Sequence, residues 1–148
     1  MKTARAAAIV LCGLVVSQAC GGDGGGGPSP SDLSGTWHLT HCEYVSTGGL
    51  GRIDLIADGG SGTMTLTTDD TLRLTVTPVS GAPVSLIATY VVEGTDLMRV
   101  TPAGASWYWA FDMSYSGAKL VLRNGSAQYD IDNDGTPDPA IWNMTMTR

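Results

Sequence analysis

Apolar side chains at every second position constrain the fold of this chain more than any other feature of its sequence. The alternation is clearest at residues 64–66, 72–76, 120–122 and 142–146. The positions between the apolar residues carry mainly Thr, with Arg and Asn. A period of two puts alternate side chains on opposite faces of a strand, so each segment has one buried face and one solvated face. The sequence therefore predicts an all-β domain.

Turn-forming residues interrupt the chain often, and no segment of helical length has apolar side chains at helical spacing. The turn signals lie at 48–49, 59–62, 69–70, 81–83, 94–96, 116–117, 124–125 and 134–135. They divide residues 32–148 into about nine strands, at 36–45, 51–57, 63–67, 72–77, 84–93, 97–101, 106–113, 118–123 and a last hairpin ending at 140–147. The alternatives are a sandwich and a barrel. Short connections and the need to remove exposed strand edges favour an antiparallel up-and-down β-barrel of about 8–9 strands.

The first strand carries a motif that resembles the opening of lipocalin-like (calycin) domains. Residues 33–39 read LSGTWHL, and Gly35 and Trp37 match the Gly-x-Trp of that family. In the family the Trp closes the floor of the barrel, and an Arg at the end of the last strand packs across its ring. The resemblance implies this role for Arg148, with Arg123 as the second choice. The family's Thr-Asp-Tyr signature is missing from the sequence, so the chain resembles lipocalin-like lipoproteins more than lipocalins proper.

The first nineteen residues read as an export signal. Two basic residues precede the apolar run 6–16, which spans about 17 Å as a helix and is too short for the ~30 Å hydrocarbon core of a membrane. Residues 17–20, SQAC, resemble a lipobox, although Ser17 stands where that pattern prefers an aliphatic residue. We expect cleavage after residue 19 and lipidation of Cys20. The alternative is an ordinary signal peptide cut near Ala19.

Residues 20–31 form the expected tether between the lipid and the domain at 32–148. Gly, Pro and Ser dominate this segment, which cannot bury enough apolar surface to offset the entropy of ordering it. Gly21, directly after the lipidated Cys, resembles lipoproteins that are moved to the outer membrane of Gram-negative cells. We therefore expect an exported protein that is lipid-anchored in the cell envelope, at the outer membrane.

Charge and thiol content narrow the expected partners. Removal of residues 1–19 takes away two positive charges, which changes the net charge from −6 to −8. An acidic surface repels phosphates, so we expect no nucleic acid partner, and it leaves the lipid as the expected contact with the membrane. With Cys12 cleaved off and Cys20 acylated, Cys42 is expected to be a small buried hydrophobic residue. The sequence identifies no protein partner.

Large apolar side chains fall on faces that are expected to point into the barrel. They are Trp107, Trp109, Phe111 and Met113 on one strand, and Trp142, Met144 and Met146 on the last. Such side chains line pockets for apolar ligands, but they also fill the lumen of an eight-stranded barrel. On the first interpretation the ligand-binding residues are Trp107, Trp109, Phe111, Trp142 and Met144. On the second interpretation the barrel is solid.

His38, His41, Cys42 and Glu43 are metal-ligating residue types at a spacing that strand geometry disfavours. Residues 38 and 42 share a face about 13 Å apart, and residues 41 and 43 supply only two ligands. If the alternation that begins at Trp37 continues along the strand, His41 and Glu43 point toward the barrel mouth. We interpret them as polar residues at its rim.

Residues 130–138, DIDNDGTPD, resemble the short Asp-rich calcium loops of dockerin and thrombospondin type-3 repeats. Asp130, Asp132, Asp134 and Asp138 occupy positions 1, 3, 5 and 9 of the loop, and Gly135 permits the sharp bend. An EF-hand would have a bidentate Glu at residue 141, which is Ile. The alternatives are a structural Ca²⁺ site and a solvated hairpin loop, since Asn-Asp-Gly favours a turn without an ion.

No arrangement of a nucleophile and a base, metalloprotease motif or phosphate-binding loop occurs in the sequence, so we expect no enzymatic activity. The leading hypothesis is a membrane-anchored, lipocalin-like lipoprotein that binds or carries a small hydrophobic ligand. The alternative is a non-enzymatic envelope protein with a solid barrel and a calcium-stabilised loop, which contacts another protein. A third class, an isomerase or hydrolase, requires His41 or Glu43 to project into a pocket.

Overall fold

The computed structural model describes residues 26–148, so the expected signal peptide, Cys20 and residues 21–25 of the expected tether lie outside the described residues. The elements in chain order are α1 (Pro30–Leu33), β1 (Gly35–Ser46), β2 (Arg52–Asp54), β3 (Ser61–Leu66), β4 (Thr71–Thr77), β5 (Val84–Glu93), β6 (Leu97–Pro102), β7 (Trp109–Tyr115), β8 (Lys119–Tyr129) and β9 (Asp138–Thr147). Among these residues no helix has the length and hydropathy that a membrane span requires.

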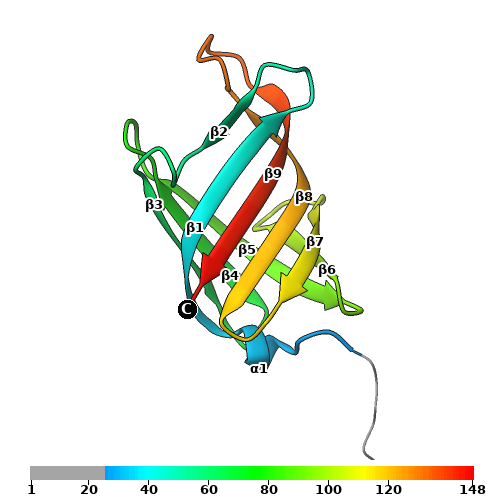
Figure 1. Cartoon of the computed structure of the whole chain (residues 1–148). Helices are drawn as coiled ribbons and strands as arrows, with labels where there is room; N and C mark the ends of the chain where they lie inside the picture. The colour runs from blue at the N-terminus through cyan, green and yellow to red at the C-terminus, as the bar shows by residue number, and fades with distance from the viewer. Residues whose placement is uncertain (1–25) are drawn as a thin grey trace, which may run out of the picture.

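Eight of the nine strands in the described part of the chain close into an antiparallel barrel (Figure 1). Strands β3 to β9 lie side by side in chain order, and β1 closes the barrel by pairing with β3 on one side and β9 on the other. Strand β2 is an additional short strand that pairs with residues 43–45 of β1. The predicted all-β, up-and-down antiparallel barrel is therefore confirmed.

The alternation in the sequence builds the interior of the barrel. On β4, Leu72, Leu74 and Val76 are buried and the residues between them are exposed or half-buried. On β9 the buried positions include Trp142 and Met144, again at every second residue. Because successive side chains of a strand point to opposite faces, closure of the sheet turns each apolar face toward one lumen.

A β-bulge near Thr40 changes which face of β1 points inward. The pairing of β1 with β9 shifts its register between Leu39 and His41. A bulge inserts one extra residue into a strand, so the buried positions pass from Trp37 and Leu39 to Cys42. The prediction that His41 points into the barrel mouth is therefore wrong, and so is the same prediction for Glu43.

A second bulge lies where the sequence predicts a turn. Strand β8 continues to Tyr129, and its pairing with β9 shifts between Leu122 and Gly125. Asn124 adopts a positive φ of 63°, and its backbone N–H donates to the Asn143 side chain at 3.1 Å. A Cβ at Gly125 would overlap the ring of Phe111, so the absence of a side chain there makes room for that ring. Asn-Gly serves here as a bulge inside a long strand.

The short helix α1 lies across one end of the barrel (Figure 1). Ser29 and Asp32 form a capping box, and Pro30 occupies the first turn, where its missing N–H has no cost. Leu33 is fully buried beneath the lumen. Residues 30 and 31, assigned to the tether from the sequence, thus belong to the folded domain. The chain approaches α1 along the same end, where the Gly27 N–H donates to the carbonyl of Gly94 at 2.6 Å.

Candidate ligand-binding cavity

The lumen is filled at the end that α1 covers and hollow at the other. The filled half contains fully buried side chains such as Met98, Leu120 and Met146. The open end holds a cavity of about 710 Å³, which is lined by residues of β1, β4, β5, β7, β8 and β9 and of the connections between strands. The same strands therefore form both a packed core and a cavity.

Stacked aromatic rings form one wall of this cavity. Tyr44 lies between Tyr129, at 4.3 Å between ring centroids, and Trp142, at 5.7 Å, with interplanar angles of 15° and 12°. Trp109 meets Trp142 edge to face at 5.4 Å, and Trp107 meets Trp109 in the same way at 4.8 Å. Offset-stacked and edge-to-face pairs are the favoured aromatic arrangements, so the rings hold one another in place.

Three of the five predicted ligand-binding residues line the cavity, namely Trp107, Trp109 and Trp142. Phe111 and Met144 are almost fully buried and are not part of the lining. Phe111 packs against Trp142 at 5.6 Å between ring centroids, so it supports the cavity wall from the core side.

Tyr44 and Tyr129 were not identified from the sequence, although both line the cavity. Each follows a bulge, at Thr40 on β1 and at Gly125 on β8, and each bulge reverses the parity of the residues after it. Extrapolation of the alternation from the start of either strand therefore puts these rings on the wrong face. An available signal was their aromatic character, because a large aromatic ring is usually at least partly buried.

Two of the lining residues, Tyr44 and Tyr129, carry hydroxyl groups that can donate hydrogen bonds. Within residues 26–148, the Tyr hydroxyls that hydrogen-bond to the protein are those of Tyr90 and Tyr115, and not those of Tyr44 and Tyr129. Burial raises the pKa of both phenols above the ordinary value, so both are neutral at physiological pH. A neutral phenol donates one hydrogen bond and accepts others.

Cys42 lies behind the same wall and is fully buried, as predicted from the sequence. The indole N–H of Trp142 donates to its Sγ at 3.5 Å. Burial raises the pKa of the Cys42 thiol to about 11, so the residue is present as a thiol and not as a reactive thiolate. Its role is to pack beneath Trp142.

At the closed end, the Arg148 guanidinium lies over the Trp37 ring, with Cζ 4.5 Å from the centroid. Arg148 also donates to the backbone carbonyls of Asp32, Ser34 and Gly117 and to the Tyr115 hydroxyl, at 2.9 to 3.1 Å. This is the contact that the lipocalin-like resemblance implied.

The other residues of that motif also lie at the floor. The Trp37 indole N–H donates to the Leu33 carbonyl at 2.8 Å, which ties α1 to β1. Gly35 begins β1 with a φ of +128°, a conformation that other residues rarely adopt. Arg123, the second choice for the floor, is exposed on β8 opposite Asp112 and does not contact Trp37.

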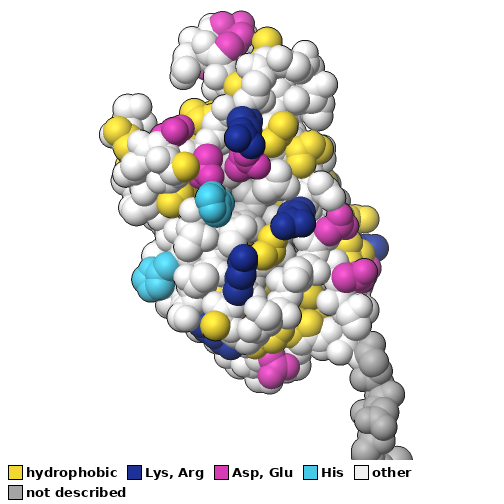
Figure 2. Space-filling model, viewed as in Figure 1, with side chains coloured by type: hydrophobic (Ala, Val, Ile, Leu, Met, Phe, Trp, Pro, Cys, Tyr) yellow, Lys and Arg dark blue, Asp and Glu magenta, His cyan; other side chains and the backbone are white. Residues whose placement is uncertain are grey.

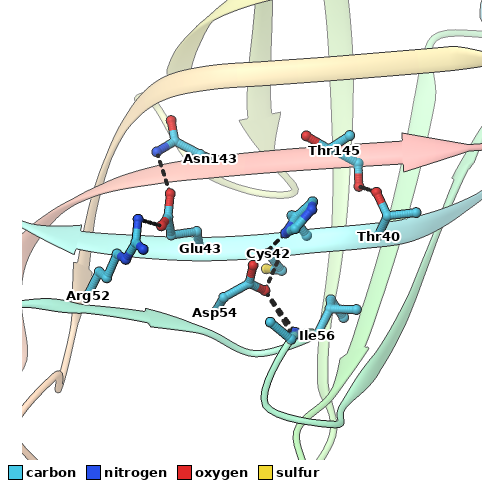
Figure 3. Close-up of polar contacts among 10 residues, drawn as sticks. Thr40, Cys42, Glu43, Arg52, Asp54, Ile56, Asn143 and Thr145 are labelled. Carbon is cyan, nitrogen blue, oxygen red and sulfur yellow. Dashed lines mark hydrogen bonds and ion pairs between the residues drawn. The ribbon is translucent and has the colours of Figure 1, made fainter.

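Polar and charged side chains gather on the outer face of β1, β8 and β9 (Figure 2). His41 Nδ1 lies 2.7 Å from Asp54 Oδ2. Arg52 lies 3.4 Å from Glu43 on the same face (Figure 3). Burial opposes ionisation of Asp54, but hydrogen bonds from His41 and from the backbone N–H groups of Cys42, Ala57 and Ile56 outweigh it and lower its pKa. These contacts fasten β2 to the outside of β1, which places His41 and Glu43 outside the barrel cavity.

The Asp-rich segment is the loop between β8 and β9, at the open end. Carboxylate oxygens of Asp130, Asp132 and Asp138 come within 4.8 Å of one another, whereas Asp134 is not part of this group. The Asp130 carboxylate accepts the backbone N–H groups of Asp134 and Gly135 at 3.1 and 3.0 Å. Such contacts also stabilise an ion-free turn, so the calcium site remains a prediction with three converging carboxylates in place of four.

Besides the cavity and the Asp-rich loop, the outer polar cluster of His41, Glu43, Arg52 and Asp54 lines a polar hollow of about 690 Å³ on the outside of the barrel. In the outer cluster the side chains pair with one another, His41 with Asp54 and Arg52 with Glu43. In the cavity wall, by contrast, two Tyr hydroxyls remain available to a bound molecule. Comparison of this chain with protein-family models, with curated proteins and with solved structures gives no match.

Proposed function

We propose that the open end of this barrel binds a small hydrophobic molecule, and that the chain is an exported lipoprotein anchored to a membrane through Cys20. The observation that carries the binding function is the cavity of about 710 Å³ with its wall of stacked aromatic rings. Pockets for small molecules measure roughly 300–1,000 Å³ and combine a mainly apolar lining with a few polar groups. This cavity has that size and that lining.

Exposed apolar side chains at the mouth also support binding. Trp107 is 54% exposed and Val84 is 62% exposed, and both line the cavity. Val79 and Tyr108, in the neighbouring connections, are 68% and 50% exposed. Large apolar side chains gathered around a cavity are typical of a site that a ligand or partner covers. The alternative of a solid barrel has support from the packed half of the lumen, but it does not account for the hollow half.

The membrane attachment is supported by the N-terminal sequence and by the position of the first described residues. Gly27 contacts Gly94 at the closed end, and the five residues 21–25 separate Cys20 from Gly26. Six peptide steps span at most about 20 Å. A lipid on Cys20 would therefore keep the closed end within about 20 Å of the membrane surface. The resemblance to lipocalin-like lipoproteins, with the Trp37–Arg148 contact, is in keeping with both parts of the proposal, and the outer membrane remains the expected location.

Ligand binding is tested first on the lipidated chain purified from cell membranes in mild detergent. Native mass spectrometry is expected to detect a co-purified small molecule at one copy per chain. Titration of the emptied protein with an uncharged fluorescent apolar probe is expected to saturate at one site. Repeated purification without a ligand, together with no saturable binding of the probe, would contradict the proposed function.

Two neighbouring residues of β5 provide a matched pair of variants for this titration. Leu86 lines the cavity, whereas Ile87 is exposed on the outer face of the same strand. Leu86→Trp fills part of the cavity and is expected to weaken probe binding at least tenfold, roughly the loss of one large apolar contact. Ile87→Trp is expected to leave binding unchanged. Equal binding by both variants would place the probe outside the cavity.

Lipid attachment is tested by intact mass and membrane partition. We expect a mature chain that begins at Cys20 and carries the added mass of acyl chains. Cys20→Ser is expected to release the protein from the membrane fraction, and the control Cys12→Ser is expected to leave it attached. Release by neither variant, or a mature chain without added mass, would contradict the anchor.

A further inference from the structure

The cavity wall carries no charge. All of the cavity's lining residues within the described part of the chain are uncharged at neutral pH, including the polar Ser126 and Gln128. Arg52 and Arg99 are not among the lining residues, and they pair with Glu43 at 3.4 Å and with Glu93 at 3.0 Å. Transfer of an ion from water into such a site is strongly unfavourable unless an opposite charge pairs with it.

We infer that this cavity selects an uncharged apolar molecule with one neutral polar group, and that it rejects a carboxylate of the same length. This inference rests on the proposed binding function and names the class of ligand. The wall has aromatic and aliphatic side chains for an apolar body and two Tyr hydroxyls for a polar group. It has no Lys, Arg or His among the described residues to neutralise an anion.

The mouth also disfavours an anionic headgroup that would remain in solvent. The Asp-rich loop joins β8 to β9 directly after Tyr129, which is one of the lining residues. Asp130 is the next residue after Tyr129 in the chain, and its carboxylate, with that of Asp58, adds to the effects of burial and of Cys42 in raising the pKa of Tyr129. A carboxylate headgroup beside Tyr129 would meet like charges there.

The hydroxyls of Tyr44 and Tyr129 favour a hydrogen-bonding group on the ligand. Tyr44 is held between two stacked rings, so its position changes little when a ligand enters. A polar group fixed in advance gives orientation and specificity to an apolar pocket. Hydroxyl, ester and ketone groups accept hydrogen bonds without a net charge, and a long-chain alcohol represents this class.

Competition between dodecanol and dodecanoate at pH 8 tests the inference on the lipidated chain. The two compounds share a chain length, and each competes with the uncharged fluorescent probe. We expect dodecanol to displace the probe at a concentration at least tenfold lower than dodecanoate. Equal displacement, or stronger displacement by the carboxylate, would overturn the inference while the proposed binding function stands. Saturable binding of neither the probe nor the alcohol would overturn both.

A charge placed in the wall sharpens the test. Leu86→Arg supplies the missing cation, and we expect it to shift the preference toward dodecanoate at least tenfold. Leu86→Gln is the matched neutral control and is expected to lower the affinities for dodecanol and dodecanoate by the same factor. An unchanged preference in a folded Leu86→Arg variant, with its fold checked by circular dichroism, would overturn the inference.

The hydroxyl is tested by Tyr44→Phe, which keeps the ring. This variant is expected to lower the affinity for dodecanol by roughly three- to tenfold, which is the contribution of one hydrogen bond. Its affinity for the hydrocarbon dodecane is expected to stay unchanged. Tyr115→Phe is the control, because the Tyr115 hydroxyl bonds to the Asp32 carbonyl at the closed end. If neither Tyr44→Phe nor Tyr129→Phe alters dodecanol binding, the assigned hydrogen bond is wrong.

Discussion

The two ends of this barrel are formed by the same strands, yet one is sealed and the other is open. At the closed end, Leu33 and Trp37 are fully buried, and the polar groups around them are bonded to the chain. At the open end, Trp107 is half exposed, and Tyr44 and Tyr129 line a cavity of about 710 Å³. The same strands run to both ends, and on β1 and β8 a bulge shifts the alternation by one residue before the open end is reached, so the apolar pattern alone does not explain the difference.

The difference lies in what completes the lumen beyond the strands. At the closed end a helix of four residues supplies an apolar side chain, and Arg148 connects the last strand to α1 and β1 through several hydrogen bonds. At the open end the strands lead into loops that leave the space between them unfilled. Fully satisfied polar networks add stability and rigidity, whereas available polar groups allow binding. We therefore expect stability to depend on the floor and ligand affinity on the mouth.

The largest expected effect separates two tryptophans. Trp37→Ala removes a fully buried ring and its hydrogen bond to Leu33, and we expect it to lower the free energy of unfolding by about 3–5 kcal/mol. Trp107→Ala, at the mouth, is expected to lower it by less than about 1 kcal/mol. Urea denaturation followed by circular dichroism measures both. Similar losses for the two variants would remove the distinction between the two ends.

The strand order and the floor contact could be predicted because each depends on local or recurrent sequence features. On β4, alternation between Leu and Thr or Arg sets the inward face without information from the rest of the chain. The Trp37–Arg148 pair was predicted from a family resemblance, and the two residues are in contact. Helix α1 has no periodicity that identifies it, but its capping residues Ser29 and Asp32 and its Pro30 were available signals.

The cavity wall could be predicted only in part, because two bulges reverse the parity of β1 and β8. Asn124-Gly125 is favourable turn chemistry in isolation, and it became a bulge because the Phe111 ring occupies the space beside Gly125. That reason comes from a neighbouring strand and cannot be read locally. The bulge at Thr40 likewise exchanges His41 for Cys42 on the inner face, so the sequence assigned the wrong residues to the mouth.

The next largest effect is expected where the filled half of the lumen meets the cavity. Gly125→Ala forces the Phe111 ring to move, and we expect a loss of about 1–3 kcal/mol in the free energy of unfolding, as in other overpacked cores. The double variant Gly125→Ala/Phe111→Leu is expected to recover part of this loss. Gly48→Ala, in an exposed connection at the mouth, is the control and is expected to change stability by less than about 0.5 kcal/mol. Thermal and urea denaturation decide between these outcomes, and no recovery in the double variant would mean that Phe111 is not the obstacle.

Removal of the side chain that crosses the floor tests the closed end from outside the core. Arg148→Met removes the contact with the Trp37 ring and the hydrogen bonds to three carbonyls. We expect this change to lower the free energy of unfolding by about 1–2 kcal/mol. Arg73→Met, on the exposed face of β4, is expected to change the free energy of unfolding by less than about 0.5 kcal/mol. Probe affinity at the mouth should be the same in both variants. Loss of probe binding in a folded Arg148→Met variant would show that the two ends are not independent.

The smallest effect concerns the Asp-rich loop at the mouth, where calcium binding would make the open end more rigid. With affinity in the ~10⁻⁴–10⁻³ M range, 1 mM Ca²⁺ would stabilise the domain by about 0.4–1.4 kcal/mol and raise the melting temperature by a few degrees. Asp132→Ala is expected to abolish this shift, because Asp132 is one of the three converging carboxylates, whereas Asp134→Ala should retain most of it. Differential scanning calorimetry in Ca²⁺ and in EDTA measures the shift. Identical melting curves in the two conditions would mean that the loop is an ion-free turn, held by the backbone N–H groups that its own carboxylates accept.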